Sequence, residues 1–256
     1  MTTLLRALLR FSAEPGLVYD SNMPGRQQEL RFRAHGGARE GAGRPAAGPR
    51  AIHHDKRIRV VASQPIHVTC RVAANVGNLR RDAVLAALRV ATIVVGRHED
   101  LRIVHASIQR THLHLLVEAA NGAALTRGVS SFLISAARRI NRAIRASGGR
   151  VFDRYHARRL STPREVRNCV AYVLNNWRHH REDRSRATSR WLVDKYASAV
   201  SFDGWKELGR GERFAAPPGY APLVVWTPRT WLLSVGWLRH GLIRLGEVPG
   251  GRDDPD

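Results

Sequence analysis

Three segments of the chain alternate apolar and polar residues, which is the pattern of a half-buried β-strand. In the first segment, apolar Ile66 and Val68 fall on one face, while polar His67 and Thr69 fall on the other. The same alternation recurs twice further along the chain. The three predicted strands lie in residues 65–72, 101–109 and 111–118.

Three longer segments repeat apolar residues every three or four positions, which predicts amphipathic α-helices. The last of them opens with Thr162, Pro163 and Glu165. These residues are an N-cap, a first-turn proline and the acidic member of a capping box. The three predicted helices are residues 80–95, 122–146 and 161–181.

The order strand, helix, strand, strand, helix predicts an α+β fold with a ferredoxin-like antiparallel sheet. We expect helices on the face that carries Ile66, Val68, Val104 and Ile108, and the helix over 161–181 at the other face. The residues between the last two helices, 148–160, are expected to be extended or turn-like. The second face is polar, so it is either solvated or functional; it carries His67, Thr69, Arg71, His105 and Ser107.

The composition divides the chain into three zones. Residues 1–57 are rich in Gly, Arg, Pro and Ala without periodicity, which predicts a flexible basic N-terminal arm. Within it, Arg44 lies in a Gly-Arg-Pro sequence of the kind that enters the minor groove of A·T-rich DNA, and a solvated linker is the alternative. Residues 58–181 hold the regular patterns, and residues 182–256 form an extension that contains Trp and Pro.

The charge of the chain is strongly positive. Its 256 residues include 42 Lys and Arg against 21 Asp and Glu, a formal net charge of +21. Nucleic acid is the commonest partner for such a charge, and an anionic membrane surface is the rival acceptor. No apolar run approaches the roughly 20 residues that span a bilayer, so we expect no membrane partner. Cys70 and Cys169 form no metal-type pair, and we expect buried thiols in a cytoplasmic protein.

The segment THLHLLVE, residues 111–118, places His112 and His114 two positions apart. On a strand they point the same way, so the two imidazoles can share a divalent cation. Two histidines on a solvated sheet face are the alternative. A metal site would need a third ligand from elsewhere in the chain.

The helix predicted over 161–181 carries an apolar stripe with Val166, Val170 and Trp177. Tyr172 and Asn176 lie one turn apart on the opposite, polar stripe. A core tyrosine would lie on the valine stripe, so this helix presents a phenol and a carboxamide together, as a functional site requires. A solvated surface tyrosine is the alternative.

These motifs together resemble the single-tyrosine HUH transposases, and within them the REP-associated tyrosine transposases. The resemblance runs from about Pro65 to His180, with HVTCRV, THLHLLVE, GRVFDRYHARRL and AYVLNNWR in the family's order and spacing. Two positions depart from the family pattern. Thr111 stands where an Asn usually precedes the first histidine, and Trp177 stands where the family often has proline.

The resemblance implies a transposase that cuts and rejoins single-stranded, hairpin-associated DNA through a 5′-phosphotyrosine link. It implies Tyr172 as the nucleophile, and His112, His114 and Asn176 as ligands of a divalent metal ion, Mg²⁺ or Mn²⁺. Such a protein would be cytoplasmic and associated with the bacterial nucleoid. Its oligomeric state, monomer or homodimer, stays open.

Further residues are candidates for DNA contact. Arginines could neutralise phosphates, while an aromatic or imidazole ring could stack on unpaired bases. Two other functions stay open: an inactive nucleic-acid-binding protein on the same scaffold, and a metal-dependent nuclease that uses water. The candidate DNA contacts are Arg44, Arg71, Arg154, Tyr155, His156 and Arg158.

Overall fold

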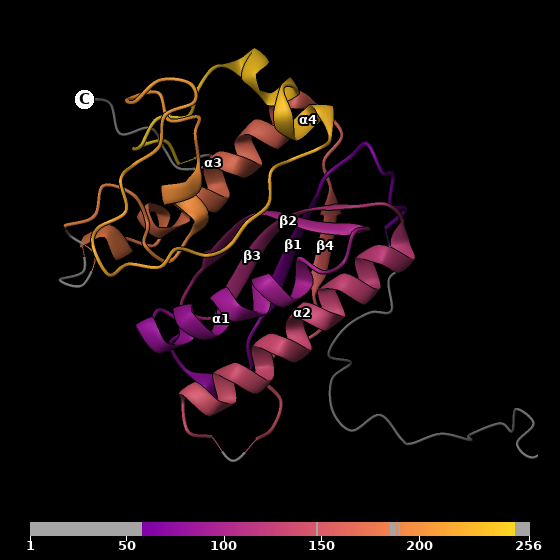
Figure 1. Ribbon diagram of the computed structural model, residues 1–256, viewed down its shortest axis with the longest axis vertical. Coiled ribbons are helices and arrows are strands. Elements are labelled where there is room, and N and C mark those ends of the chain that lie inside the picture. Colours follow the sequence, from indigo (N-terminus) through magenta and orange to yellow (C-terminus); the bar gives the residue numbers. More distant parts are fainter. Residues whose placement is uncertain (1–57, 147, 185–187, 189, 249–256) are drawn as a thin grey trace, which may run out of the picture. The chain divides into compact units, whose positions relative to one another are not determined.

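A computed structural model describes residues 58–146, 148–184, 188 and 190–248. Its centre is a four-stranded antiparallel sheet with helices packed on it (Figure 1). The strands are β1 (Ile66–Arg71), β2 (Leu101–Ile108), β3 (His112–Ala119) and β4 (His156–Arg159). The longer helices are α1 (Asp82–Val95), α2 (Gly122–Ala143) and α3 (Pro163–His179), and α4 (Trp231–Ser234) is a single turn.

The strands lie in the order β2-β3-β1-β4, and the elements follow as β1-α1-β2-β3-α2-β4. This is the ferredoxin-like arrangement, so the predicted α+β fold is confirmed. Residues 148–160, which were expected to be extended or turn-like, include the short edge strand β4. The N-terminal arm lies outside the described residues, and with it Arg44.

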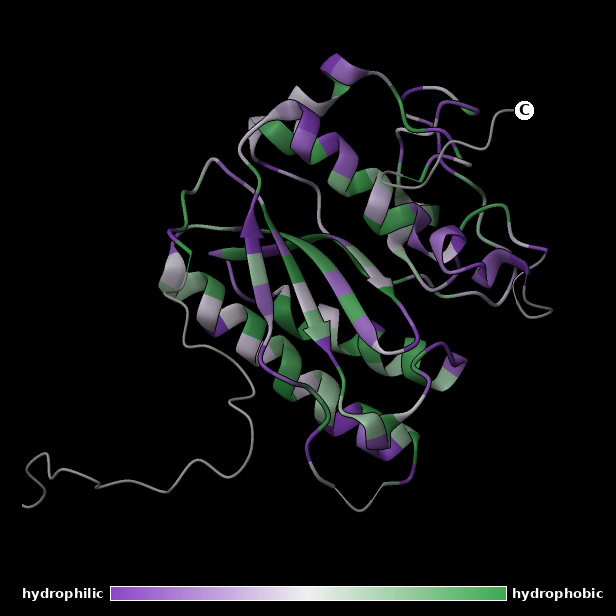
Figure 2. Ribbon diagram, turned by 180° about the vertical axis from the view of Figure 1, so that it is seen from behind, coloured by the Kyte–Doolittle hydropathy of each residue, from purple (hydrophilic) through white to green (hydrophobic). Residues whose placement is uncertain are grey.

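One face of the sheet is covered by α1 and α2, which lie side by side (Figure 1). Ile66, Val68 and Cys70 of β1 are fully buried against these helices, as the alternation predicted. Figure 2 shows this alternation of hydrophobic and hydrophilic residues along the strands. The apolar side chains of this face form the first core of the protein.

One expectation about this face is wrong. Val104 was expected beside Ile108, but it belongs to the second core, on the opposite face of the sheet. The cause is a register shift in the β2–β3 ladder between Ile103 and His105. A β-bulge adds one residue to a strand and reverses the faces of the residues before it.

The second face is covered by α3. Thr162 caps this helix, its side chain accepts from the Glu165 N–H, and Glu165 returns the bond to the Thr162 N–H, so the predicted capping box is present. Val166, Val170 and Trp177 of α3 are buried in the second core, together with Leu116 of β3.

The segments after α3 complete the second core. Phe202, Trp205 and Trp237 are buried there against α3. The edge strand β2 is also covered, because Ile108 N–H donates to the Tyr196 carbonyl and Trp226 N–H donates to the Ile103 carbonyl. Within the described residues, none of the helices has the length and apolar character needed to cross a bilayer.

Candidate functional site

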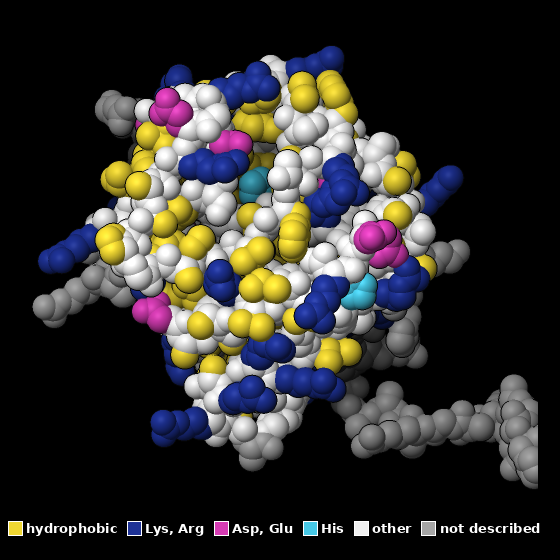
Figure 3. Space-filling model, viewed as in Figure 1, with side chains coloured by type: hydrophobic (Ala, Val, Ile, Leu, Met, Phe, Trp, Pro, Cys, Tyr) yellow, Lys and Arg dark blue, Asp and Glu magenta, His cyan; other side chains and the backbone are white. Residues whose placement is uncertain are grey.

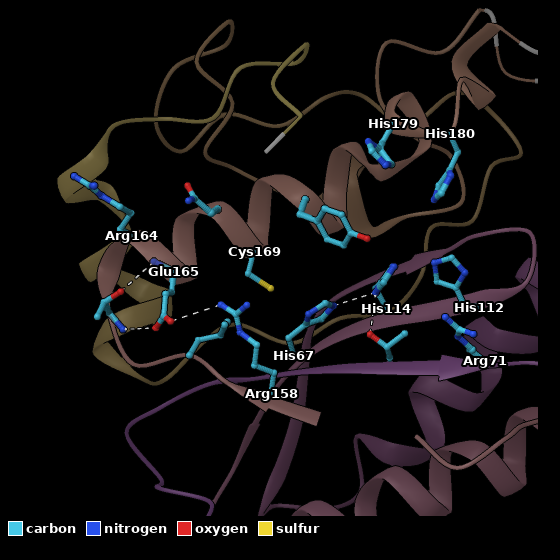
Figure 4. A pocket seen from close by; sticks show the side chains of 15 residues that line it. His67, Arg71, His112, His114, Arg158, Arg164, Glu165, Cys169, His179 and His180 are labelled. Atoms are coloured by element: carbon cyan, nitrogen blue, oxygen red, sulfur yellow. Dashed lines mark hydrogen bonds and ion pairs between the residues drawn. The ribbon is translucent and has the colours of Figure 1, made fainter. Parts of the chain in front are cut away.

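A cavity of about 800 Å³ lies between α3 and the polar face of the sheet (Figure 4). The strands contribute histidines, a threonine and arginines, and α3 contributes residues from its cap to its end. Residues from four separate elements therefore line one cavity. They are His67, Thr69, Arg71, His112, His114, Arg158, Leu160, Thr162, Arg164, Glu165, Asn168, Cys169, Tyr172, His179 and His180.

The predicted histidine pair lies at the floor of this cavity. The rings of His112 and His114 have centroids 4.6 Å apart, as expected for alternate residues of one strand. His112 is partly exposed, but only 3% of His114 is exposed because α3 covers it. The alternative reading, two histidines on a solvated sheet face, is therefore wrong for His114.

The nitrogen atoms of His114 have different surroundings. Its Nδ1 lies 3.0 Å from His67 Nε2 and 3.3 Å from Thr69 Oγ1, both on the neighbouring strand β1. Its Nε2 is buried and, among the described residues, has no hydrogen-bond partner. The alternation of polar residues in β1 predicts His67 and Thr69 on this face. Their contact with His114 depends on the register of β1 against β3, which the sequence alone does not give.

Tyr172 projects from α3 over the histidines. Its ring lies edge-on to His114, with centroids 5.1 Å apart, and edge-on to His67 at 6.1 Å. Burial raises the pKa of the phenol, the nearby Cys169 raises it further, and the Asn176 amide one turn away lowers it slightly. The ring is partly exposed in the cavity, so a ligand there can reach the hydroxyl.

Asn176 is fully buried one turn beyond Tyr172. Neither its Nδ2 nor its Oδ1 makes a hydrogen bond of normal geometry to a described residue, although the amide lies close enough to the Tyr172 hydroxyl to lower the pKa of the phenol. Buried carboxamides are nearly always paired, because an unsatisfied polar group costs about 1–3 kcal/mol. The neighbouring Asn175 behaves normally and donates to the carbonyls of Arg244 and Glu247. Asn175, on the polar side of this helix, therefore holds the C-terminal segment in place.

Three histidines of the cavity, His67, His112 and His114, are held neutral. Burial lowers the pKa of His67 and of His112 to about 4, and that of His114 to about 2. Repulsion from neighbouring ionisable groups adds to the effect: from Arg158 beside His67, and from His180 and Arg71 beside His112. A neutral imidazole has a free lone pair, which is the form that binds a metal ion.

Two histidines at the end of α3 extend the site. The ring of His180 lies edge-on to His112, with centroids 6.0 Å apart, and His179 lies beside His180 at 5.2 Å. His112 and His180 also line a second cavity of about 560 Å³, together with Arg110, Arg181 and Arg184. Neither His179 nor His180 was predicted as a site residue. Their spacing from Asn176, three and four positions along one helix, was the available signal.

The opposite end of the cavity, near the start of α3, is basic. Arg158 of β4 lies 3.6 Å from Glu165, and Arg164 lines the same end (Figure 4). Arg71 lies beside His112, its partner in the β1–β3 ladder. Arg71 and Arg158, both predicted as DNA contacts, therefore lie in the cavity with the histidines.

The other predicted DNA contacts lie elsewhere. His156 is exposed on β4 opposite Thr69, close to the cavity but not among its lining residues. Tyr155 is partly buried against the first core, and Arg154 is exposed. A role of these residues in DNA binding stays a prediction.

The residues of the cavity fit a metal ion in part. Among the described residues, the Nε2 of His114 and the amide of Asn176 are buried without a hydrogen bond of normal geometry. Thr111 Oγ1 lies 3.3 Å from His112 Nδ1, so that His112 can offer its Nε2. Within the described residues, no three His, Cys, Asp or Glu side chains are grouped closely enough to hold a metal ion. A site here would need the Asn176 carboxamide or the substrate as its third ligand.

No protein-family description and no curated protein matches the chain in sequence. Several solved structures are similar to it, and three of them have 15–17% sequence identity to it. A REP-associated tyrosine transposase bound to a REP hairpin has 15% identity and a TM-score of 0.41, over 70% of this chain and 93% of that one. A candidate transposase from Deinococcus radiodurans has 17% identity and a TM-score of 0.31, over 43% and 85%. A bacterial tRNA(His) guanylyltransferase-like protein in complex with GTP has 16% identity and a TM-score of 0.34, over 50% and 66%. At these scores the function has to be argued from the site itself.

Proposed function

We propose that the protein is a DNA strand transferase that cleaves and rejoins single-stranded DNA, with Tyr172 as its nucleophile. The observation that carries the proposal is the meeting of Tyr172 with His112 and His114 in one cavity, with the buried, unpartnered Asn176 one turn away. The sequence motifs that resemble single-tyrosine HUH transposases supply these same four residues.

A divalent metal ion, Mg²⁺ or Mn²⁺, would be held by His112, His114 and the Asn176 oxygen. The amide oxygen suits these hard cations better than a thiolate would. When bound, such an ion polarises a phosphodiester and orients it. Two atoms without a hydrogen-bond partner among the described residues, His114 Nε2 and Asn176 Oδ1, support this ligand set, because both could bind one metal ion.

The Tyr172 oxygen attacks a backbone phosphorus in the proposed reaction. A bond forms between the phenol oxygen and phosphorus, and the bond from phosphorus to the 3′ oxygen breaks. The phenol loses its proton to water, and the leaving 3′ oxygen takes one up. The link to the protein conserves the bond energy, so a free 3′-OH can later attack it and rejoin strands without ATP.

The raised pKa of Tyr172 makes its hydroxyl a poor nucleophile in isolation. Alignment with a polarised phosphate therefore has to supply most of the rate enhancement. Arg71 and Arg158 line the same cavity and would bind phosphates on either side of the reacting one. Positive side chains are also spread over the molecular face shown in Figure 3, as a long polyanion would require.

Incubation of the protein with labelled single-stranded hairpin DNA and Mn²⁺, followed by denaturing electrophoresis, tests this proposal. We expect a covalent protein–DNA adduct for the wild type. Tyr172→Phe should bind the DNA with near wild-type affinity but form no adduct and cut nothing, because the ring without its hydroxyl cannot form the phosphodiester.

A matched control is Tyr220→Phe. Tyr220 is also partly exposed, and its hydroxyl donates to the Lys195 carbonyl at 2.5 Å outside the cavity. Loss of that bond costs about 0.5–1.5 kcal/mol of stability and should leave the adduct in place. Cleavage without an adduct would indicate a nuclease that uses water. Binding without cleavage by the wild type would indicate an inactive binding protein.

A further inference from the structure

His114 is joined through its Nδ1 to two side chains of β1, His67 at 3.0 Å and Thr69 at 3.3 Å (Figure 4). We infer that His67, with Thr69, is a positioning residue that holds His114 in the tautomer whose Nε2 lone pair faces a divalent metal ion. The inference rests on the proposed function, since it concerns how the metal site of that function is prepared.

Only one proton can lie between His67 Nε2 and His114 Nδ1, so two arrangements are possible. In the first, His114 donates from Nδ1 and its Nε2 keeps a free lone pair. In the second, His67 donates and the proton of His114 moves to Nε2. That nitrogen is buried without a partner among the described residues. The second arrangement therefore leaves an unpaired buried N–H, while the first leaves a ready ligand.

Thr69 is compatible with the first arrangement. It lies directly opposite His114 in the β1–β3 ladder, and its oxygen can accept from the same Nδ1–H that points to His67. Two acceptors then share one donor, and the imidazole ring is held from one side. The backbone ladder fixes both acceptors, so the ring needs no reorganisation before a ligand binds.

His67 itself is not placed as a ligand. The Nε2 of His67 faces the Nδ1 of His114. A metal ion would bind the other ring nitrogen of His114, Nε2, which has no partner among the described residues. The position of His67 is in turn fixed in the ladder by Leu116 on one side and Arg158 on the other. The partner of a metal-binding histidine is commonly a carboxylate or a carbonyl, and here a neutral imidazole takes that place.

The first test measures the tautomer without any metal. Long-range ¹H–¹⁵N spectra of the ¹⁵N-histidine-labelled protein should show His114 protonated at Nδ1, with its resonances assigned by their loss in His114→Gln. In His67→Leu, His114 should change to a mixture of tautomers or to the Nε2–H form. A wild-type His114 protonated at Nε2 overturns the inference.

The second test measures Mn²⁺ binding by calorimetry. Loss of a partner to a metal-binding histidine typically weakens the affinity by about 10–100-fold, and we expect a weakening of that size in His67→Leu. His67→Gln, whose amide oxygen can still accept, should recover most of it. The thermal unfolding of each variant is followed in parallel, and the comparison is made below the midpoint of the least stable one.

His98→Leu is the matched control, because His98 is bonded to Ser131 at 3.2 Å and lies outside the cavity. It should bind Mn²⁺ as the wild type does. Equal affinity of wild type and His67→Leu, or no Mn²⁺ binding by the wild type, overturns the inference. Failure of the proposed function looks different: Tyr172→Phe would still cut DNA while the tautomer and affinity differences persist.

Discussion

The Tyr172 ring lies edge-on to the His114 ring, 5.1 Å between centroids, although one residue comes from a helix and the other from a strand. Two packing interfaces set this relationship. Leu116, on the same face of β3 as His114, is buried against α3, and the C-terminal segments cover α3 from the other side. The distance between phenol and imidazole therefore depends on the second core.

His112→Ala and His114→Ala should both abolish cleavage but differ in stability. His112 is partly exposed, so its loss should change the free energy of unfolding by less than about 1 kcal/mol. His114 is buried and bonded to His67, so its loss should cost about 1–3 kcal/mol. Denaturant unfolding and a cleavage assay with Mn²⁺ measure the two effects. Full cleavage by either variant would exclude that histidine as a required ligand.

The sequence predicted the three longer helices, three of the strands and the capping box because each depends on local pattern. Strand alternation and helical spacing also placed Tyr172 and Asn176 on one face, and His112 and His114 on another. The cavity brings Tyr172 and the two histidines together. Local periodicity is sufficient for such faces, since side-chain direction follows from backbone geometry.

Features that depend on contacts between distant segments could not be predicted. The contact of His67 with His114 needs the register of β1 against β3, and the face of Val104 needs the bulge in β2. The different roles of Asn175 and Asn176 depend on the position of the C-terminal segment, since of the two side chains it is Asn175 that donates to carbonyls of that segment. These contacts are long-range in sequence, and no local pattern encodes them.

The salt dependence of DNA binding should show whether Arg158 contacts a phosphate. For single strands, the slope of log affinity against log salt changes by about 0.7 for each phosphate contact. Arg158→Gln should reduce the slope by about that amount. Glu165 keeps its bonds from Ser161 and Thr162, so the cap of α3 should survive. Arg127→Gln on α2, which breaks an exposed ion pair with Asp100, is the matched control and should change the slope less. Equal slopes for wild type and Arg158→Gln would exclude a phosphate contact.

His105 should make the fold less stable in acid. It is bonded to Ser198, it lies against Phe202, and burial lowers its pKa to about 4 although Asp203 opposes this. Between pH 6.5 and pH 4 the unfolded chain takes up a proton here that the folded chain does not. The stabilisation is thus complete above pH 6.5 and is lost as the pH falls toward 4.

His105→Leu removes this proton uptake. The His105 imidazole is partly exposed at the wall of a third cavity, and solvent there reduces the cost of charging it. We therefore expect a change in the free energy of unfolding on the order of 1–3 kcal/mol. The difference in unfolding free energy between wild type and variant should shift by that amount, in favour of the variant, from pH 7.5 to pH 4.5. Parallel stability curves over this range would contradict the prediction.

Asn176→Leu should separate stability from activity. The side chain is fully buried, and its amide makes no hydrogen bond of normal geometry to a described residue, so its polarity contributes little to the fold. A leucine of similar branched shape removes the desolvation cost, and the free energy of unfolding should stay equal or rise by about 1 kcal/mol. Metal-dependent cleavage should be lost, because the leucine has no oxygen that could bind the metal ion.

Asn175→Leu is the control: it loses two hydrogen bonds to Arg244 and Glu247 and should destabilise the protein. An Asn176→Leu variant that is destabilised but still cleaves DNA would make Asn176 a structural residue rather than part of the site.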